Sequence, residues 1–334
     1  MHDCGMTTNG PDEKATGPQS AGNRVCAIVV TYHPGPEVPA HIEAILGQVS
    51  RVVVVDNEAT AESRERLSAF GNHPSVELIE NLENLGIATA LNQGTARALA
   101  GGFDWIATFD QDSGVPEGYF AELLAAHASY PERDRIAVLA PLYRDRHLGF
   151  VYSPAGSVRH NLTGNVPVSV TAASGNLVSP AALRTVGGFR DDFFIAYVDF
   201  EFCLRCRRAG WLVLEVRRVI LDHAMGEYQQ RRWLGRNVRI NDYSIARRYY
   251  QARNLLILYA CLGSVDLRWA LRDAWFYSHD VIKVLLFGEN RWEKVCAMAT
   301  GYWHAVTGRR GRWQPTPGRS GYPPGATASG RPEI

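Results

Sequence analysis

The chain has 334 residues, of which 46% are hydrophobic and 21% are charged, and its formal net charge is +1. This composition is typical of a folded protein with one large core or two, and the near-zero charge gives no global attraction to nucleic acid. Its six cysteines are too sparse for a disulfide scaffold. No run reaches the roughly 18–20 apolar residues that span a bilayer, and no signal peptide is visible. We therefore expect a cytoplasmic protein.

The first half of the chain alternates strand and helix patterns. Continuous apolar runs predict buried strands at residues 25–32, 52–55, 76–79 and 105–109. Amphipathic spacing predicts helices between them, at residues 37–47, 60–70 and 87–100. This alternation is typical of an α/β fold whose parallel sheet is covered by helices on both faces.

The second half is less regular. Short strand candidates lie at residues 136–139, 166–170 and 213–219, a helix is predicted at residues 199–209, and the pattern from about residue 233 is mainly helical and aromatic. The polar, Gly-rich ends predict disordered tails at residues 1–23 and 309–334. We therefore predict a main domain of residues 24–230 and a C-terminal helical region of residues 231–308.

Polar side chains follow three of the predicted strands, at the ends where ligands bind in open α/β sheets. They are Thr31 and Tyr32, Asp56 and Asn57, and Asp110 and Asp112. We expect them to line one cleft. Two carboxylates one residue apart suit a divalent cation that also carries phosphate oxygens. The dinucleotide motif Gly-x-Gly-x-x-Gly and the Walker motif are both absent, which argues against a dehydrogenase or a P-loop NTPase.

Gly86 and Asn92 extend this pattern. Gly86 precedes a helix of small residues, where a ligand can approach the backbone closely, and Asn92 lies on that helix. Each residue alone could be an ordinary loop or surface position. Together with the polar strand ends, they favour a nucleotide site.

The motifs, in this order, resemble family 2 glycosyltransferases, which are inverting, nucleotide-sugar-dependent enzymes of the GT-A fold. The resemblance implies a Rossmann-like mixed sheet flanked by helices, with a C-terminal helical extension. The resemblance covers residues 25–254. Its donor half, residues 24–115, contains Val-Val-Thr-Tyr at 29–32, Val-Asp-Asn at 55–57, Asn-Leu-Gly-Ile-Ala at 84–88 and Phe-Asp-Gln-Asp-Ser at 109–113. Its acceptor half, residues 116–230, contains Ser-Gly-Asn at 174–176, Gly-Gly-Phe at 187–189 and Asp-Phe-Glu-Phe-Cys-Leu-Arg at 199–205, and Arg-Asn follows at 253–254. The Asp-Gln-Asp-Ser form is most similar to the rhamnosyltransferase branch, which uses dTDP-rhamnose to build cell-surface saccharides.

The resemblance implies a role for each matching residue. Thr31, Tyr32, Asp56 and Asn57 would hold the base and ribose, and Gly86 and Asn92 would line the nucleotide pocket. Asp110 and Asp112 would serve the sugar and a Mg²⁺ or Mn²⁺ ion, with Asp112 the more direct ligand. The acceptor or phosphate side would contain Ser174, Gly175, Asn176, Glu201, His223 and Arg253. His223 is either close to the diphosphate and metal or structural.

Asp199 is the implied general base. The Glu-Asp pair usual at this position reads Val198-Asp199 here, and Glu201 supplies a second carboxylate two residues on. Positions 199 and 201 face different directions on a helix, so both cannot point equally at one substrate. We favour Asp199.

Several alternatives remain open. The donor could be a UDP-sugar, as in a galactofuranosyltransferase, or the chain could bind nucleotide sugars without catalysis. The acceptor would be a saccharide, free or linked to polyprenyl diphosphate. Residues 205–253 contain 12 arginines and no lysine, which indicates either a solvated helical face or a surface for phosphates or anionic lipid. The aromatic region after residue 231 would suit peripheral contact with the inner face of the membrane, a cap over the active site, or a dimer interface.

Overall fold

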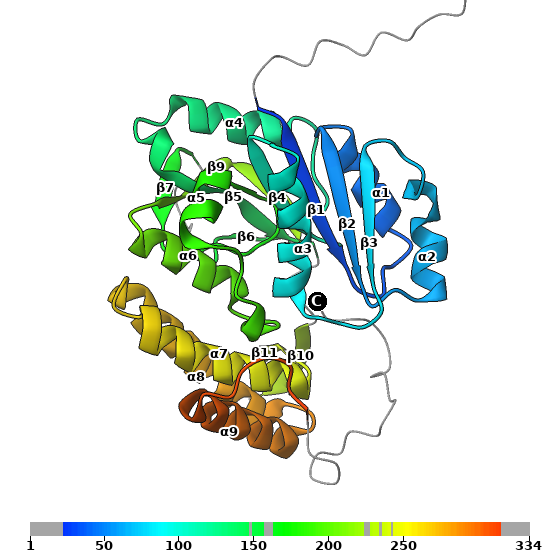
Figure 1. Ribbon diagram of the computed structural model, residues 1–334. Helices are drawn as coiled ribbons and strands as arrows, with labels where there is room; N and C mark the ends of the chain where they lie inside the picture. Colours follow the sequence, from blue (N-terminus) through cyan, green and yellow to red (C-terminus); the bar gives the residue numbers. More distant parts are fainter. Residues whose placement is uncertain are drawn as a thin grey trace, which may run out of the picture.

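The computed structural model describes residues 23–146, 149–156, 163–223, 228–233, 236–241 and 243–314. Within them, a mixed sheet with the strand order β3-β2-β1-β4-β8-β5-β9-β7 forms the centre of the molecule, and β6 pairs with β5 at one side (Figure 1). The strands are β1 (Val25–Thr31), β2 (Arg51–Asn57), β3 (Val76–Asn81), β4 (Trp105–Asp110), β5 (Ile136–Asp145), β6 (Val151–Tyr152), β7 (Asn165–Val168), β8 (Asn176–Val178) and β9 (Leu212–His223). The predicted α/β fold with a mixed sheet is confirmed.

Strand register brings the polar strand ends together. Strands β1, β2, β3 and β4 run parallel, and Thr31 of β1 lies opposite Asp56 of β2. On the other side of β1, Val30 lies opposite Asp110 of β4. Strand β8 is antiparallel to both β4 and β5, whereas β5 and β9 are parallel. The three predicted clusters therefore meet at one edge of the sheet.

Helices cover both faces of the sheet because side chains alternate along each strand. Cys26, Ile28 and Val30 of β1 belong to the core under α3 (Ile87–Ala100), α5 (Pro180–Val186) and α6 (Val198–Arg208). Val25, Ala27 and Val29 belong to the opposite core, under α1 (Val38–Leu46) and α4 (Tyr119–Ser129). The short elements α2 (Ala61–Leu67), η1 (Ser68–Phe70), η2 (Arg133–Arg135) and η3 (Asp191–Phe193) connect these layers.

A C-terminal layer lies beyond the carboxyl ends of β1, β2 and β4 (Figure 1). It contains α7 (Ile245–Leu262), α8 (Leu267–Phe287) and α9 (Arg291–Thr307). A hairpin of β10 (Tyr228–Trp233) and β11 (Arg236–Asn241) precedes it, where the sequence pattern favoured helix from about residue 233. No helix among the described residues combines the length and the apolar character that crossing a bilayer requires.

Residues 309–314 return from the end of α9 toward the donor half. Trp313 stacks on Tyr249 with ring centroids 4.4 Å apart, and Arg312 pairs with Glu83 at 2.5 Å. The predicted C-terminal tail is therefore wrong for residues 309–314, because specific contacts hold them against α7 and the loop after β3. The rest of that tail, and residues 1–22 of the N-terminal tail, lie outside the described residues.

Candidate active site

Two aspartates and a histidine converge at the edge of the sheet. Asp110 ends β4, Asp112 lies in the following turn, and His223 ends β9. His223 Nδ1 lies 3.2 Å from Asp112 Oδ1, and His223 Nε2 lies 4.0 Å from Asp110 Oδ2. One ligand atom from each residue lies within 4.8 Å of the other two. Two carboxylate oxygens and an imidazole nitrogen at this separation form a donor set that can hold a divalent cation.

The charges in this group are strongly coupled. Burial raises the pKa of Asp110 to about 6, against the opposing charge of His223. Burial would also raise the pKa of Asp112, but the hydrogen bond and charge of His223 outweigh it, so the pKa falls below its ordinary value. Burial would lower the pKa of His223, but the hydrogen bond and charge of Asp112 and the charge of Asp110 raise it. The site therefore stabilises a positive charge between its two carboxylates.

Two buried serine hydroxyl groups lie beneath the turn that contains Asp110 and Asp112. Ser174 Oγ accepts a hydrogen bond from the Asp110 amide at 3.1 Å, and Ser113 Oγ lies 2.5 Å from it. Gly175 has a φ of +81°, and a Cβ there would lie 2.5 Å from the Tyr119 hydroxyl. Since Ser174 and Asn176 are buried, residues 174–176 support the site in this structure rather than offer an exposed acceptor surface.

Gln111 has a role that the sequence analysis did not identify. Its Oε1 accepts a hydrogen bond from the Tyr32 amide at 2.9 Å, and its Nε2 donates to the Tyr32 carbonyl at 3.1 Å. His41 Nδ1 lies 2.9 Å from the Gln111 carbonyl. This two-sided amide contact joins the end of β1 to the end of β4, so it positions Tyr32 beside the two aspartates.

A small, open pocket lies at the same edge of the sheet. It is lined by Tyr32, Asn57 and Gly86, together with Val30, Asn84, Ile87, Phe194 and Ile195. Asn57 shapes the loop after β3, because its Oδ1 accepts a hydrogen bond from the Leu85 amide at 3.0 Å. Its Nδ2 donates to Asn84 Oδ1, also at 3.0 Å.

Thr31 and Asp56 lie behind this pocket and are buried. Thr31 Oγ1 donates to Asp56 Oδ1 at 3.1 Å, and Ser63 Oγ donates to Asp56 Oδ2 at 2.6 Å. Burial raises the pKa of Asp56, with both hydroxyl groups opposing the shift. Each carboxylate oxygen of Asp56 thus already has one hydrogen-bond donor. The sequence did not reveal this role of Ser63, because its only signal was the capping pattern at the start of α2.

Gly86 allows the acceptor half to reach the pocket. Its φ is +87°, and a Cβ would lie 2.6 Å from the Phe194 carbonyl oxygen and 2.7 Å from the Phe194 ring. A side chain at this position would therefore be strained and would also push away the far wall of the pocket. The motif glycine is explained by this contact between two halves of the chain.

Asp199 lies in the first turn of α6, after a loop with left-handed backbone. Phe194, Ala196 and Tyr197 have φ values of 64°, 66° and 62°, a conformation that non-glycine residues adopt only when surrounding structure enforces it. Asp199 Oδ1 accepts a hydrogen bond from the Phe200 amide at 2.9 Å. Burial raises the pKa of Asp199 to about 6, and the charge of Asp110 adds to the shift. The predicted base and the predicted metal ligand thus influence one another electrostatically.

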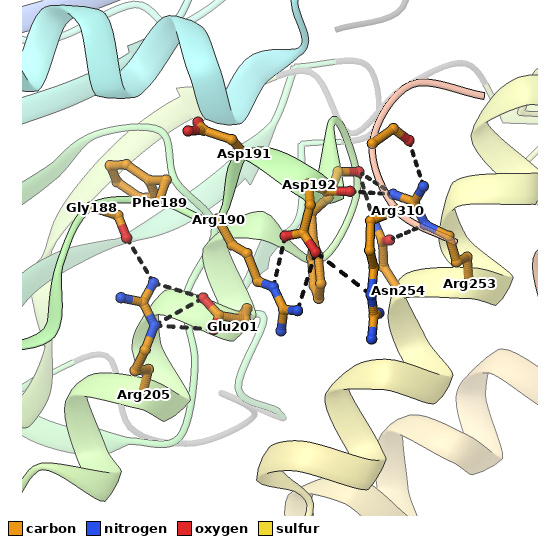
Figure 2. A network of polar contacts seen from close by, with 12 residues as sticks. Gly188, Phe189, Arg190, Asp191, Asp192, Glu201, Arg205, Arg253, Asn254 and Arg310 are labelled. Atoms are coloured by element: carbon orange, nitrogen blue, oxygen red, sulfur yellow. Dashed lines mark hydrogen bonds and ion pairs between the residues drawn. The ribbon is translucent and has the colours of Figure 1, made fainter. Parts of the chain in front are cut away.

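Three residues assigned to ligands from the sequence are instead fixed within the protein, and Figure 2 shows Glu201 and Arg253 among them. Glu201 is buried and pairs with Arg205 at 2.8 Å, and Arg205 also donates to the Gly188 carbonyl. Asn92 Nδ2 donates to the Phe189 carbonyl at 2.7 Å, and Asn92 Oδ1 accepts from the Phe189 amide at 2.7 Å. Neither side chain lines the pocket.

Arg253 is the third of these residues. It is fully buried on α7 and donates to the carbonyls of Asp192 at 2.7 Å, Phe193 at 3.1 Å and Gly311 at 2.5 Å (Figure 2). The neighbouring Asn254 donates to the carbonyls of Phe193 and Ile195. Instead of meeting a phosphate, Arg253 holds the loop that leads to Asp199.

The chain is similar to known glycosyltransferases. Residues 26–153 match the family described as "Glycosyl transferase family 2". The "dTDP-rhamnosyl transferase RfbF" of Shigella flexneri is 31% identical over 246 residues, which cover 71% of this chain and 80% of that relative. The "N-acetylglucosaminyl-diphospho-decaprenol L-rhamnosyltransferase" of Mycobacterium tuberculosis is 28% identical over 231 residues, which cover 57% of this chain and 72% of that relative.

A solved structure shares the fold. The mannosyltransferase PcManGT from Pyrobaculum calidifontis, solved with GDP-Man and Mn²⁺, superimposes with a TM-score of 0.54 at 18% identity and covers 86% of this chain and 81% of its own. The carboxylates at the strand ends, the pocket beside them and a relative above 30% identity along four-fifths of its length lead to one conclusion. The chain belongs to glycosyl transferase family 2 and is a glycosyltransferase of the GT-A fold.

Proposed function

We propose that this enzyme transfers L-rhamnose from dTDP-rhamnose to a saccharide acceptor, with inversion, in the synthesis of a cell-surface polysaccharide. The observation that carries the proposal is the pairing of Asp199, whose pKa is raised to about 6, with the Asp110, Asp112 and His223 group. Such a pairing supplies a proton acceptor and a cation-binding group for one displacement reaction. The similarity to two proteins named as rhamnosyltransferases supports the choice of sugar.

Asp199 would act as the general base. Its carboxylate would take the proton of the acceptor hydroxyl while that oxygen forms a bond to the anomeric carbon. The bond from the anomeric carbon to the diphosphate oxygen breaks at the same time, and the nucleoside diphosphate leaves on the opposite face. A positioned base typically contributes about 10²–10⁴-fold to the rate, and a pKa near 6 keeps Asp199 ionised at neutral pH.

Asp110, Asp112 and His223 would hold a divalent cation, which when bound stabilises negative charge on a departing diphosphate. Mg²⁺ prefers oxygen ligands, and the similar mannosyltransferase PcManGT was solved with Mn²⁺, so of the two ions we favour Mn²⁺. Two arginines add positive charge beside these carboxylates. The charge of Arg247 opposes the rise that burial causes in the pKa of Asp110, and the charge of Arg146 helps to lower the pKa of Asp112. We infer that both arginines face the diphosphate.

The pocket beside β1 would hold the nucleoside. Tyr32 and Asn57 offer polar and stacking contacts, while Ile87, Phe194 and Ile195 supply apolar surface that suits the methyl group of thymine. A UDP-sugar transferase remains the second candidate, because "Galactofuranosyltransferase GlfT1" of Mycobacterium tuberculosis is also similar, at 27% identity over 121 residues.

The acceptor is proposed to be a saccharide linked to a polyprenyl diphosphate, which would place the enzyme at the inner face of the membrane. The name of the mycobacterial relative describes such a lipid-linked acceptor. A lipid-linked acceptor lies at a bilayer surface, so a transferase acting on it gains from peripheral attachment.

Donor binding separates these candidates. A panel of dTDP- and UDP-sugars with Mn²⁺ would be screened for the shift each causes in the thermal unfolding midpoint, since a ligand of the folded state raises it by mass action. We expect dTDP-rhamnose to give the largest shift and to be consumed when a lipid-linked saccharide is added. A larger shift with UDP-galactofuranose would replace the rhamnose proposal.

A pair of variants tests the role of Asp199. Asp199→Asn should keep the shift caused by dTDP-rhamnose and lose transfer. The matched control is Asp134→Asn, whose side chain is 97% exposed and which should transfer at the wild-type rate. Wild-type transfer by Asp199→Asn would exclude Asp199 as the base.

A further inference from the structure

An apolar stripe faces away from the protein along α8. Leu267, Leu271, Trp275, Ile282 and Leu286 are all more than half exposed, with Leu271 at 65% and Trp275 at 64%. At 3.6 residues per turn these positions fall within an arc of about 100°. The opposite side of the helix contributes the buried Trp269, Ala270 and Val284. The helix therefore has two apolar faces, and only one of them is used inside the protein.

Helix α9 has exposed aromatic residues of its own. Trp292 and Trp303 are 69% and 65% exposed, and Tyr302 and Val306 are exposed beside them. The two helices pack against one another. Single exposed apolar residues are normal on a protein surface, but a contiguous group marks an interaction site. Phe276 is also exposed but falls outside the apolar arc of α8. We call the exposed apolar residues of the α8 stripe and of α9 the docking face; they are Leu267, Leu271, Trp275, Ile282, Leu285, Leu286, Trp292, Tyr302, Trp303 and Val306.

The charges of α8 indicate what the docking face binds. Both of its acids are turned inward: Asp273 accepts a hydrogen bond from the Tyr259 hydroxyl at 2.8 Å, and Asp280 pairs with the buried Arg248. Arg268 is exposed and falls at the edge of the apolar arc, and Arg291 is exposed at the start of α9. The solvent side of α8 thus combines leucine and tryptophan with positive charge and lacks acids.

We propose that the docking face lies in the surface of an anionic lipid bilayer. Amphipathic helices that bind membranes in this way present tryptophan and leucine to the acyl chains and arginine to the lipid phosphates, and each basic residue near an anionic surface adds to the attraction. Helix α8 is about 30 Å long, so the stripe would lie along the bilayer plane. The inference rests on the proposed function only for its purpose, which is to bring the enzyme to a lipid-linked acceptor.

Helix α7 connects the docking face to the loop that leads to Asp199. Asp280 and Asp273 of α8 bind Arg248 and Tyr259 of α7. From the same helix, Arg253 and Asn254 hold the carbonyls of the loop that leads to Asp199. Binding of α8 and α9 to a bilayer would therefore set the position of this loop relative to the lipid surface.

Vesicle binding tests the proposal without donor or acceptor. The full chain would be sedimented with vesicles of phosphatidylcholine alone or mixed with phosphatidylglycerol, at low and high salt. We expect binding to the anionic vesicles at low salt. The triple variant L271S/W275S/L286S should weaken it by about tenfold or more, and Arg268→Gln should weaken it by about fivefold. The matched control is Leu82→Ser, which removes an 87% exposed leucine of the donor half and should bind like the wild type.

A second measurement uses the unaltered protein. Lipids brominated on their acyl chains should quench its tryptophan fluorescence, because Trp275, Trp292 and Trp303 belong to the docking face. Absence of wild-type binding at low salt would overturn the proposal, and so would unchanged binding by the triple variant. A dimer that the triple variant dissociates, without vesicle binding, would overturn it in favour of a second copy of the chain. The shift caused by dTDP-rhamnose is measured separately, so failure of the proposed function would be distinguishable.

Discussion

His223 Nδ1 lies 3.2 Å from Asp112 Oδ1, although the two residues come from β9 and from the turn after β4. The carboxylates raise the pKa of His223, so a cation held by the same three residues would compete with a proton on the imidazole. We expect Mn²⁺ to raise the unfolding midpoint, more strongly as the pH rises, because the competing proton is lost. Titration calorimetry in buffers of different ionisation enthalpy would count the protons released.

The same site predicts how variants respond to metal. Asp112→Asn should lose the midpoint shift caused by Mn²⁺ and lose transfer, whereas Asp134→Asn should keep both. Transfer that continues unchanged in EDTA would contradict a metal-assisted reaction.

The pH dependence of transfer should report Asp199. Its pKa is about 6, and a base works only when it is deprotonated, so kcat/KM should fall about tenfold per pH unit below 6 and level off above it. Saturating Mn²⁺ keeps Asp110 ionised and offsets its charge, so the acid limb belongs to Asp199 and its midpoint should lie at or below pH 6. A profile that stays flat from pH 5 to pH 8 would assign proton removal to another group.

Glu201 should matter for stability and not for proton removal. Glu201→Gln removes the ion pair that holds Arg205, which in turn binds the Gly188 carbonyl. We expect a loss of about 2 kcal/mol in the free energy of unfolding with kcat within a few fold of the wild type. Urea unfolding and initial-rate measurements test both expectations. A loss of transfer comparable to that of Asp199→Asn, in a fully folded variant, would make Glu201 the base.

Arg253 should affect donor binding from a distance. Its guanidinium reaches three carbonyls at once, and the ammonium of a lysine cannot reproduce this geometry. Since the adjacent Phe194 and Ile195 line the proposed nucleotide pocket, Arg253→Lys should raise KM for the donor by about tenfold. Arg309→Lys, at an exposed position, is the matched control. A lower unfolding midpoint with unchanged KM would mean that Arg253 only stabilises the fold.

The grouping of polar residues at one edge of the sheet was predictable, because the local sequence patterns of strands and helices determine it. Parallel strands with polar residues after their carboxyl ends must bring those residues together, and the register of Thr31 with Asp56 and of Val30 with Asp110 follows that rule. The role of Asp199 as general base stays a prediction, supported by its motif position and by its raised pKa, and among the described residues no arginine is paired with its carboxylate, in contrast to Glu201.

The partners of buried polar groups were not predictable. Asn92 binds Phe189, which is 97 residues further along the chain, and no local pattern encodes that contact. Glu201 and Arg253 carry the same charges as ligand-binding residues, so only the three-dimensional structure shows that Arg205 and backbone carbonyls satisfy them. Gln111 was overlooked for a related reason, because its partner is the backbone of Tyr32 and not a side chain.

Residues 309–314, which follow α9, matter for hybrid enzymes made from two related transferases. Arg312 of this segment pairs with Glu83 in the donor half, while its Gly311 carbonyl receives Arg253 from α7. A hybrid enzyme that takes its donor half from one relative and the rest of its chain from another would take Glu83 from one parent and Arg312 from the other. Successful exchange of donor specificity should therefore require residues 309–314 to be matched to the loop at residues 82–86, although Arg312 and Glu83 are 229 residues apart in the sequence.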